Sequence, residues 1–107
     1  MNAIKEERVK ELIRHKASEF LKKESAGKGL ITVTRVRLAD KGTKAVILFT
    51  VFPTEEESAA VNFAKRKRSE FREYLRQETK LFQLPFIDFN IDLGEKNRQK
   101  IDVLSKK

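Results

Sequence analysis

The sequence predicts an α+β fold in which three strands form one sheet and the helices pack on one face of it. Two observations predict this class. The 107 residues alternate between helical and strand periodicity in the order α-β-β-α-β. Apolar residues, 39% of the chain, form one stripe on each helix, so the stripes can be buried together. A single domain over residues 1–107 is expected, with a peripheral C-terminal segment from about residue 95.

The first element is expected to be an amphipathic helix from about Asn2 to Lys23. Its apolar residues recur at three- and four-residue steps, while lysines and glutamates fill the other face. Gly27 and Gly29 are expected to end it. The members of its apolar stripe are Val9, Leu12, Ile13, Ala17, Phe20 and Leu21.

Two strands follow, over Leu30–Leu38 and Ala45–Phe52, and the short turn between them favours an antiparallel hairpin. The apolar phase of the first strand changes between Val33 and Val36. A β-bulge near Thr34-Arg35 is therefore expected, because one extra residue would restore a single buried face. The second strand is apolar on both faces, so it is expected at the centre of the sheet.

A long second helix is expected from about Ser58 to Leu84, with Thr54 or Ser58 as its cap. Two cations interrupt its apolar stripe. The helix is therefore expected to bend or break between Lys67 and Ser69, although no proline or glycine enforces this.

The last strand is predicted over Phe86–Leu93, where apolar and polar residues alternate and the final residue faces the core. Gly94 is expected to end it, and a short helix is expected over Asn97–Leu104. Asp88 and Asp92 lie on the outer face of this strand. They are expected to be solvated or salt-bridged, because oxygen ligands from one strand rarely hold a cation.

The basic residues indicate an anionic partner. Lysines and arginines number 24 against 16 acidic residues, a net charge of +8. Such charges side by side repel one another unless an anion meets them, and a nucleic acid is the obvious candidate. The other interpretation is a solvated helix face. The candidate RNA-binding residues are Lys65, Arg66, Lys67, Arg68, Arg72, Arg76, Lys80, Arg35 and Arg37.

The candidates divide into two groups. The first group lies on the second helix and begins with four consecutive cations, Lys65 to Arg68. A row at spacing four then places Arg72, Arg76 and Lys80 on the same helix face as Arg68. Changing Arg68 and Arg72 to glutamate is expected to weaken RNA binding and leave folding intact. The second group is Arg35 and Arg37, on the first strand. Two arrangements are open for them: an exposed rim beside the second helix, or ion pairs with Asp88 or Asp92 across the sheet.

Composition argues against several other classes. The chain has no cysteine, which excludes a disulfide scaffold and cysteine-based metal sites. No window approaches the roughly 20 apolar residues of a spanning helix, and no signal sequence is visible, so a cytoplasmic location is expected. His15, the only histidine, has no visible catalytic partner. No enzyme activity, cofactor, metal or small-molecule substrate is expected.

The phenylalanines are expected to serve the core rather than to stack on RNA bases. Phe52 and Phe86 flank prolines near strand ends and are expected to be partly exposed. The phenylalanines expected on core stripes are Phe20, Phe49, Phe63, Phe71 and Phe89.

Three segments resemble the ribosome-binding factor A family. Ile31–Leu38 with Lys44–Val51 is similar to the family's first hairpin. Phe71-Arg72 followed by Leu75 is similar to the segment after its helix kink, and Leu81–Asp92 is similar to its entry into the last strand. The resemblance extends from about Val9 to Leu104. It implies a type-two KH-like fold without the glycine-rich RNA loop.

The resemblance also implies binding to the immature small ribosomal subunit and its RNA, in support of late maturation and growth in the cold. The chain departs from the family where the kink usually carries Ala-x-Gly and here reads Lys67-Arg68-Ser69. The aspartate of the hairpin turn also stands one position early, at Asp40.

The leading hypothesis is a monomeric, non-enzymatic assembly factor of the small ribosomal subunit. One alternative is a generic KH-like domain that binds single-stranded nucleic acid. The other is a protein-interaction module whose basic surface meets an acidic partner.

Overall fold

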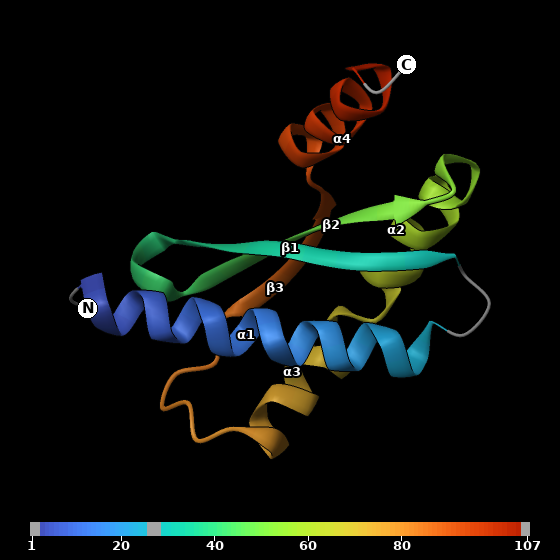
Figure 1. Cartoon of the computed structure of the whole chain (residues 1–107). Helices are drawn as coiled ribbons and strands as arrows, with labels where there is room; N and C mark the ends of the chain where they lie inside the picture. The colour runs from blue at the N-terminus through green and yellow to red at the C-terminus, as the bar shows by residue number, and fades with distance from the viewer. Residues whose placement is uncertain (1–2, 26–28, 106–107) are drawn as a thin grey trace.

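The frame of the molecule is a three-stranded sheet in the order β1-β2-β3. The structure is a computed structural model that describes residues 3–25 and 29–105 (Figure 1). β1 (Leu30–Ala39) pairs antiparallel with β2 (Lys44–Phe52), and β2 pairs parallel with β3 (Phe86–Ile91). β2 is the central strand, as its apolar residues on both faces predict.

Three helices cover one face of this sheet: α1 (Ala3–Glu24), α2 (Glu57–Arg66) and α3 (Arg68–Glu78). A fourth, α4 (Leu93–Ser105), follows β3 and projects from the sheet on the side opposite α3 (Figure 1). The α+β class and the α-β-β-α-β order are confirmed, with the second helix split in two. All five phenylalanines expected in the core are buried there: Phe20, Phe49, Phe63, Phe71 and Phe89.

The β-bulge in β1 is confirmed. Pairing passes from Val33 opposite Phe49 to Arg35 opposite Leu48, so Thr34 is the extra residue. Valines on both sides of the bulge are buried, and Arg35 is exposed on the other face of the sheet. The extra residue therefore keeps one apolar face along the whole strand.

α1 confirms the first predicted helix to within one residue at each end. Gly27, one of the two residues expected to end it, lies outside the described residues. Gly29 adopts φ +80°, in the left-handed region that favours glycine. A Cβ atom there would lie 3.1 Å from the Phe52 carbonyl oxygen and 3.1 Å from the Glu56 Cβ.

Replacing Gly29 with alanine is therefore expected to lower the free energy of unfolding by about 1–2 kcal/mol, through backbone strain and contact with a carbonyl. Gly94 is a matched control, because it lies inside α4 and an added Cβ there would make only ordinary contacts. Gly94→Ala is expected to be neutral or to stabilise by up to about 1 kcal/mol. Urea denaturation followed by circular dichroism measures both. Equal effects of the two substitutions would contradict the argument.

The second helix begins and ends differently from the prediction. It starts after a 3-10 turn at Thr54–Glu56 without a side-chain cap, so the predicted capping by Thr54 or Ser58 is wrong. The break is confirmed at Lys67, with φ −96° and ψ 7°, between α2 and α3. α3 ends at Glu78 instead of continuing to Leu84.

The early end of α3 has a local cause. Thr79 leaves the helix with an extended backbone, φ −137° and ψ 168°, and its hydroxyl donates to the Leu75 carbonyl at 2.6 Å. The Thr79 N–H also donates to the Leu75 carbonyl, at 3.0 Å, so backbone and hydroxyl of the C-cap residue close the last turn on the same oxygen. Leu81 still packs against the core, but from an irregular segment.

The end of β3 also differs from the prediction. The strand stops at Ile91, and Leu93 begins α4 with its side chain exposed instead of facing the core. The cause is Asp92, whose carboxylate accepts the Glu95 backbone N–H at 3.0 Å and so caps the helix. α4 therefore starts before the predicted Asn97 and includes Gly94, which was expected to end the strand.

Candidate nucleic-acid interface

The sheet face opposite the helices α1 to α3 carries a charged residue on each of its outer strands. Register places Arg37 of β1 beside Val46 of β2, and Val46 beside Asp88 of β3. Adjacent strands lie about 4.8 Å apart, so β1 and β3 are separated by about 10 Å. Arg37 and Asp88 therefore mark the two edges of one narrow face.

At the β3 edge, the Asp88 carboxylate forms ion pairs with one cation from each half of the split helix. Lys65 of α2 lies 2.9 Å from its Oδ1, and Arg68 of α3 lies 3.5 Å from the same oxygen. The Arg68 Nε also donates to the Lys65 carbonyl at 2.9 Å, which connects the two helices across their break. One carboxylate thus holds two positive charges, and the group keeps a net charge of +1.

The pKa of Asp88 lies below its ordinary value of 3.8. Burial alone would raise it. The hydrogen bond from Lys65, the Phe89 backbone N–H, and the charges of Lys65 and Arg68 outweigh burial.

This pKa direction predicts an acid-sensitive contribution to stability. A lowered pKa in the folded protein means that the contribution is complete well above the ordinary value of 3.8 and is lost as pH falls through the folded-state pKa. Asp88→Asn is expected to flatten the decline in the free energy of unfolding between about pH 5 and about pH 2.5. Urea denaturation at several pH values tests this, and parallel curves for the two proteins would contradict it.

At the break itself, Lys67 is held in place and Arg66 is not. The Lys67 ammonium lies 3.2 Å from Glu70 and 5.8 Å from the centre of the Phe63 ring. The Arg66 side chain is exposed and makes no ion pair or hydrogen bond with any of the residues described. Arg66 is therefore available to a partner without disturbing the fold.

The predicted row along the second helix does not stay together. Arg72 donates from Nε to the Pro85 carbonyl and from Nη2 to the Leu84 carbonyl, both at 3.1 Å. Arg76 pairs with Glu73, and Lys80 lies beyond the end of α3. Arg72 therefore secures the entry to β3, and these two bonds argue against the expectation that the double change of Arg68 and Arg72 to glutamate leaves folding intact.

On β1, Arg35 forms an ion pair with Asp92, which is one of the two arrangements expected from the sequence. Its Nε lies 3.2 Å from Asp92, which is only 3% exposed. Thr34, the bulge residue, donates its hydroxyl to the same carboxylate at 2.6 Å. Burial would raise the pKa of Asp92, but the hydrogen bonds from Thr34 and from the Glu95 N–H, with the charge of Arg35, lower it.

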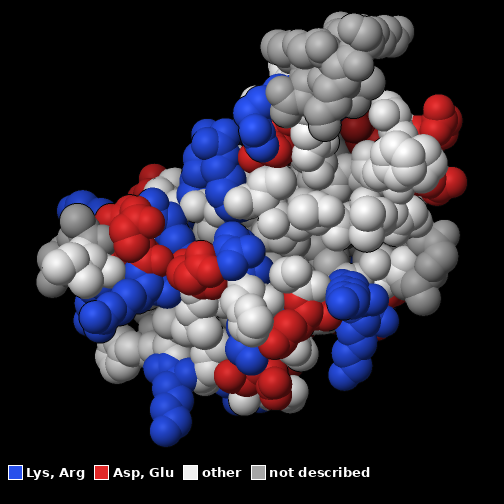
Figure 2. Space-filling view, viewed as in Figure 1, with Lys and Arg blue, Asp and Glu red and all other residues white. Residues whose placement is uncertain are grey.

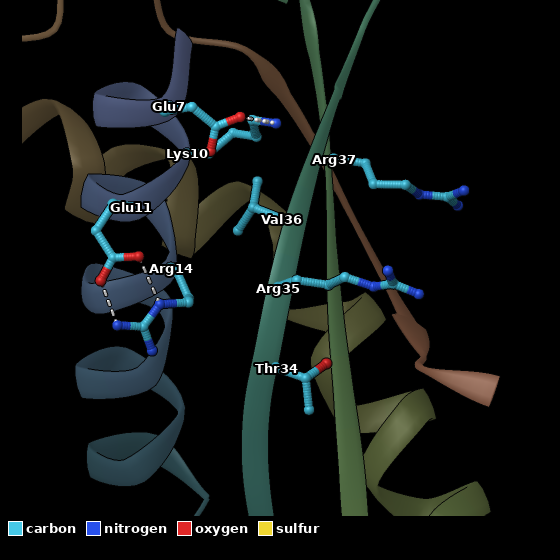
Figure 3. Close-up of a pocket in the computed structure, with 8 residues that line it drawn as sticks. All are labelled: Glu7, Lys10, Glu11, Arg14, Thr34, Arg35, Val36 and Arg37. Atoms are coloured by element: carbon cyan, nitrogen blue, oxygen red, sulfur yellow. Dashed lines mark hydrogen bonds and ion pairs between the residues drawn. The ribbon is translucent and has the colours of Figure 1, made fainter. Parts of the chain in front are cut away.

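Arg37 is exposed and, like Arg66, has no hydrogen-bond or ion-pair partner in the part of the chain that the structure describes. Figure 3 shows Arg35 and Arg37 pointing away from α1, while Val36 between them points toward it. The two arginines lie on β1, at the edge of the sheet opposite β3. They do not form the rim beside the second helix that was the other expectation.

The hollow between α1 and β1, about 420 Å³, is a weaker candidate site. On α1, Lys10 pairs with Glu7 and Arg14 with Glu11, so these cations are locally neutralised (Figure 3). Figure 2 shows acidic and basic side chains interspersed along α1, whereas basic side chains gather above β1 toward the base of α4. In this view the basic side chains therefore gather beside β1 and not along α1.

Two features of this surface were missed from sequence. Lys44 lies beside Phe86 across β2 and β3, and both side chains are exposed. The pairing of Asp92 with Arg35 was one of the expected alternatives, but its bond to Thr34 and its capping of α4 were not expected. The spacing Asp92-x-x-Glu95 is a capping pattern and could have revealed the start of α4.

No group of three or more metal-ligating side chains occurs within residues 3–25 and 29–105. Over the same ranges, none of the helices is long and apolar enough to cross a membrane.

A mixed three-stranded sheet with an antiparallel hairpin, followed by a split helix and a parallel third strand, defines a KH-like α+β protein. The sequence profile of the family described as ribosome-binding factor A matches residues 5–105. The chain belongs to the ribosome-binding factor A family, as the resemblance of its motifs predicted.

Two solved structures agree with this fold. The crystal structure of ribosome-binding factor A from Thermus thermophilus has a TM-score of 0.70 at 19% identity, covering 78% of this chain and 92% of that one. A solution NMR structure from Thermotoga maritima, provisionally assigned as ribosome binding factor A, has a TM-score of 0.58 at 24% identity, covering 82% and 83%. A comparison with curated proteins gave no match.

Proposed function

We propose that this chain is an assembly factor that binds the immature small ribosomal subunit through its ribosomal RNA and supports late maturation. The whole chain would act as one KH-like domain, with α4 at its periphery. Family membership supports a ribosome-binding role, and the net charge of +8 supports RNA as the contacted component.

The observation that carries this proposal is the distribution of positive charge around the sheet face. Arg37 on β1 and Arg66 at the helix break are exposed and without a described partner. Beside Arg66 in the chain, Lys65 and Arg68 share a single carboxylate, that of Asp88. Positive charge is therefore in excess both on β1 and at the helix break, and RNA phosphates would neutralise it.

The break adds a second attraction for phosphate. α3 begins at Arg68, and the first N–H groups of a helix have no partner within it. Such an N-terminus favours an anion, and here it adjoins Arg66 and Arg68. The family's glycine is absent, but this chain supplies cations at the same place.

Co-sedimentation with ribosomal fractions tests the proposal. The protein is expected with free small subunits, in preference to assembled ribosomes, and its loss is expected to leave precursor small-subunit RNA. Absence from free small subunits, together with normal RNA maturation after gene deletion, would overturn it.

The salt dependence separates the alternatives. Each phosphate contact should contribute about one unit to the slope of log affinity against log salt concentration. A steep slope with equal affinity for arbitrary RNA and for small subunits would indicate a generic RNA-binding domain. A flat slope would indicate an acidic protein partner.

A further inference from the structure

Phe86 is a large apolar side chain on the outer surface of a structured strand. It is the first residue of β3 and is 69% exposed, because Ile87 beside it takes the inward position. The Arg72 guanidinium lies over its ring, 5.0 Å from the ring centre. The guanidinium thus covers one face of the Phe86 ring, and the rest of the ring is exposed to solvent.

Arg72 is itself fixed by the two carbonyls that precede Phe86 in the chain. The ring is further held by its own backbone, since the Phe86 N–H donates to the Thr43 carbonyl at 2.8 Å. A ring held in this way loses little freedom when a flat partner stacks on it. Arg72 therefore acts as a positioning residue for Phe86 and is not itself available for bidentate phosphate contact.

We infer that Phe86 is a stacking platform for an unpaired RNA base, with phosphates on either side bound by lysine and arginine. This inference rests on the proposed function and specifies a contact within it. Unpaired bases stack readily on exposed aromatic side chains, and every base offers a flat π-face.

The surroundings of Phe86 supply the cations that such a base would need for its phosphates. Lys44 is its cross-strand neighbour on β2, exposed on the same face. On the other side, Arg68 lies one helical turn before Arg72 and has Lys65 beside it at Asp88. Charge complementarity thus favours an RNA strand over an apolar protein segment.

Phe52 is exposed to a similar degree as Phe86 but has different neighbours. It is similarly exposed, at 73%, also at a strand end and next to a proline. Its cross-strand neighbour is the exposed Leu30, and Glu56 lies nearby, where both approach Gly29. An apolar and acidic setting does not suit RNA, so Phe52 serves as the matched control.

The chain contains no tryptophan, so Phe86→Trp introduces a single fluorescent reporter of stacking. Titration with a single-stranded oligouridine or oligoadenosine is expected to quench its emission, because a stacked base quenches indole fluorescence. Phe52→Trp is expected to keep its emission over the same titration. An abasic oligonucleotide of equal length should bind Phe86→Trp more weakly and leave its emission unchanged.

Affinity provides the second measurement. Phe86→Ala is expected to weaken binding of the same oligonucleotides by about 5-fold to 100-fold, the range for loss of one stacked base, while Phe52→Ala leaves it unchanged. Phe86→Tyr should retain affinity. Circular dichroism checks that each variant is folded.

The outcomes separate the inference from the proposed function. If the wild-type protein binds neither RNA nor small subunits, the proposed function fails. If the wild type binds RNA but Phe86→Ala binds equally well, only the stacking inference is overturned. Emission of Phe86→Trp that shifts on adding small subunits but is unaffected by RNA would instead assign Phe86 to a protein contact, and would also overturn the inference.

Discussion

Arg37→Glu combined with Arg66→Glu is expected to weaken binding to small-subunit RNA on the order of 30-fold at low salt, and to reduce the salt slope by about two units. Arg37 on β1 and Arg66 at the end of α2 are exposed and have no partner among the residues described. Each reversal removes a phosphate contact and adds a repulsive charge. Filter binding at several salt concentrations measures both quantities.

The control for this double variant must carry the same net charge. Each replacement of a cation by glutamate removes two units, so two replacements lower the net charge from +8 to +4. Lys22→Glu with Lys23→Glu makes the same change in the last turn of α1, away from the sheet face. We expect the control to bind nearly as the wild type does. Equal losses in the two variants would show that overall charge, and not these two arginines, determines binding.

Stability should be unaffected by the Arg37 and Arg66 changes, within about 0.5 kcal/mol, because neither side chain contributes a described contact. The choice of Arg66 in place of Arg72 matters here. Arg72 holds the Leu84 and Pro85 carbonyls, so its replacement would confound a binding defect with a folding defect.

Asp92→Ala is expected to have the largest effect on stability, lowering the free energy of unfolding by about 2–4 kcal/mol. The carboxylate is almost fully buried and accepts from the Thr34 hydroxyl, the Glu95 N–H and Arg35. Its removal deprives α4 of its cap and removes the group that joins Thr34 and Arg35 to the start of that helix, although the Thr34 hydroxyl also lies 3.1 Å from the Leu48 carbonyl. Urea denaturation measures the change, and hydrogen exchange should show the greatest loss of protection in α4.

Asp92→Asn separates the two parts of this effect. The amide oxygen can still accept the Glu95 N–H, but the negative charge facing Arg35 is lost. We expect a smaller cost than for alanine, with α4 largely retained. If alanine at this position costs less than about 1 kcal/mol, the carboxylate does not organise this region as the structure indicates.

The sheet and its core were predictable because their apolar residues have a clear period. The phase change between Val33 and Val36 indicated the bulge, and the doubly apolar Ala45–Phe52 segment indicated a central strand. Errors arose where one residue decides a boundary. α3 ends early because Thr79 takes an extended backbone, and α4 starts early because the Asp92 carboxylate caps it. Periodicity does not report such local features.

The candidate cations could be named from the sequence, but their arrangement could not. Spacing of four along one helix placed Arg72, Arg76 and Lys80 with Arg68, but it assumed a continuous helix and carried no information about partners. In the structure, Arg72 donates hydrogen bonds to backbone carbonyls, and Arg76 forms an ion pair with Glu73. Exposure and pairing depend on what the rest of the fold brings near each charge, which a linear pattern does not contain.

The bulge at Thr34 has a consequence for the order in which the chain assembles. Its hydroxyl reaches a carboxylate 58 positions later, and the Asp92 N–H donates to the Phe49 carbonyl of β2. The anchor of α4 therefore draws on all three strands and exists only after they have paired. Contacts so distant in sequence close late, because chain entropy opposes them until the intervening structure is in place. During synthesis, the cap that fixes the start of α4 is expected to form last, after the three strands have paired.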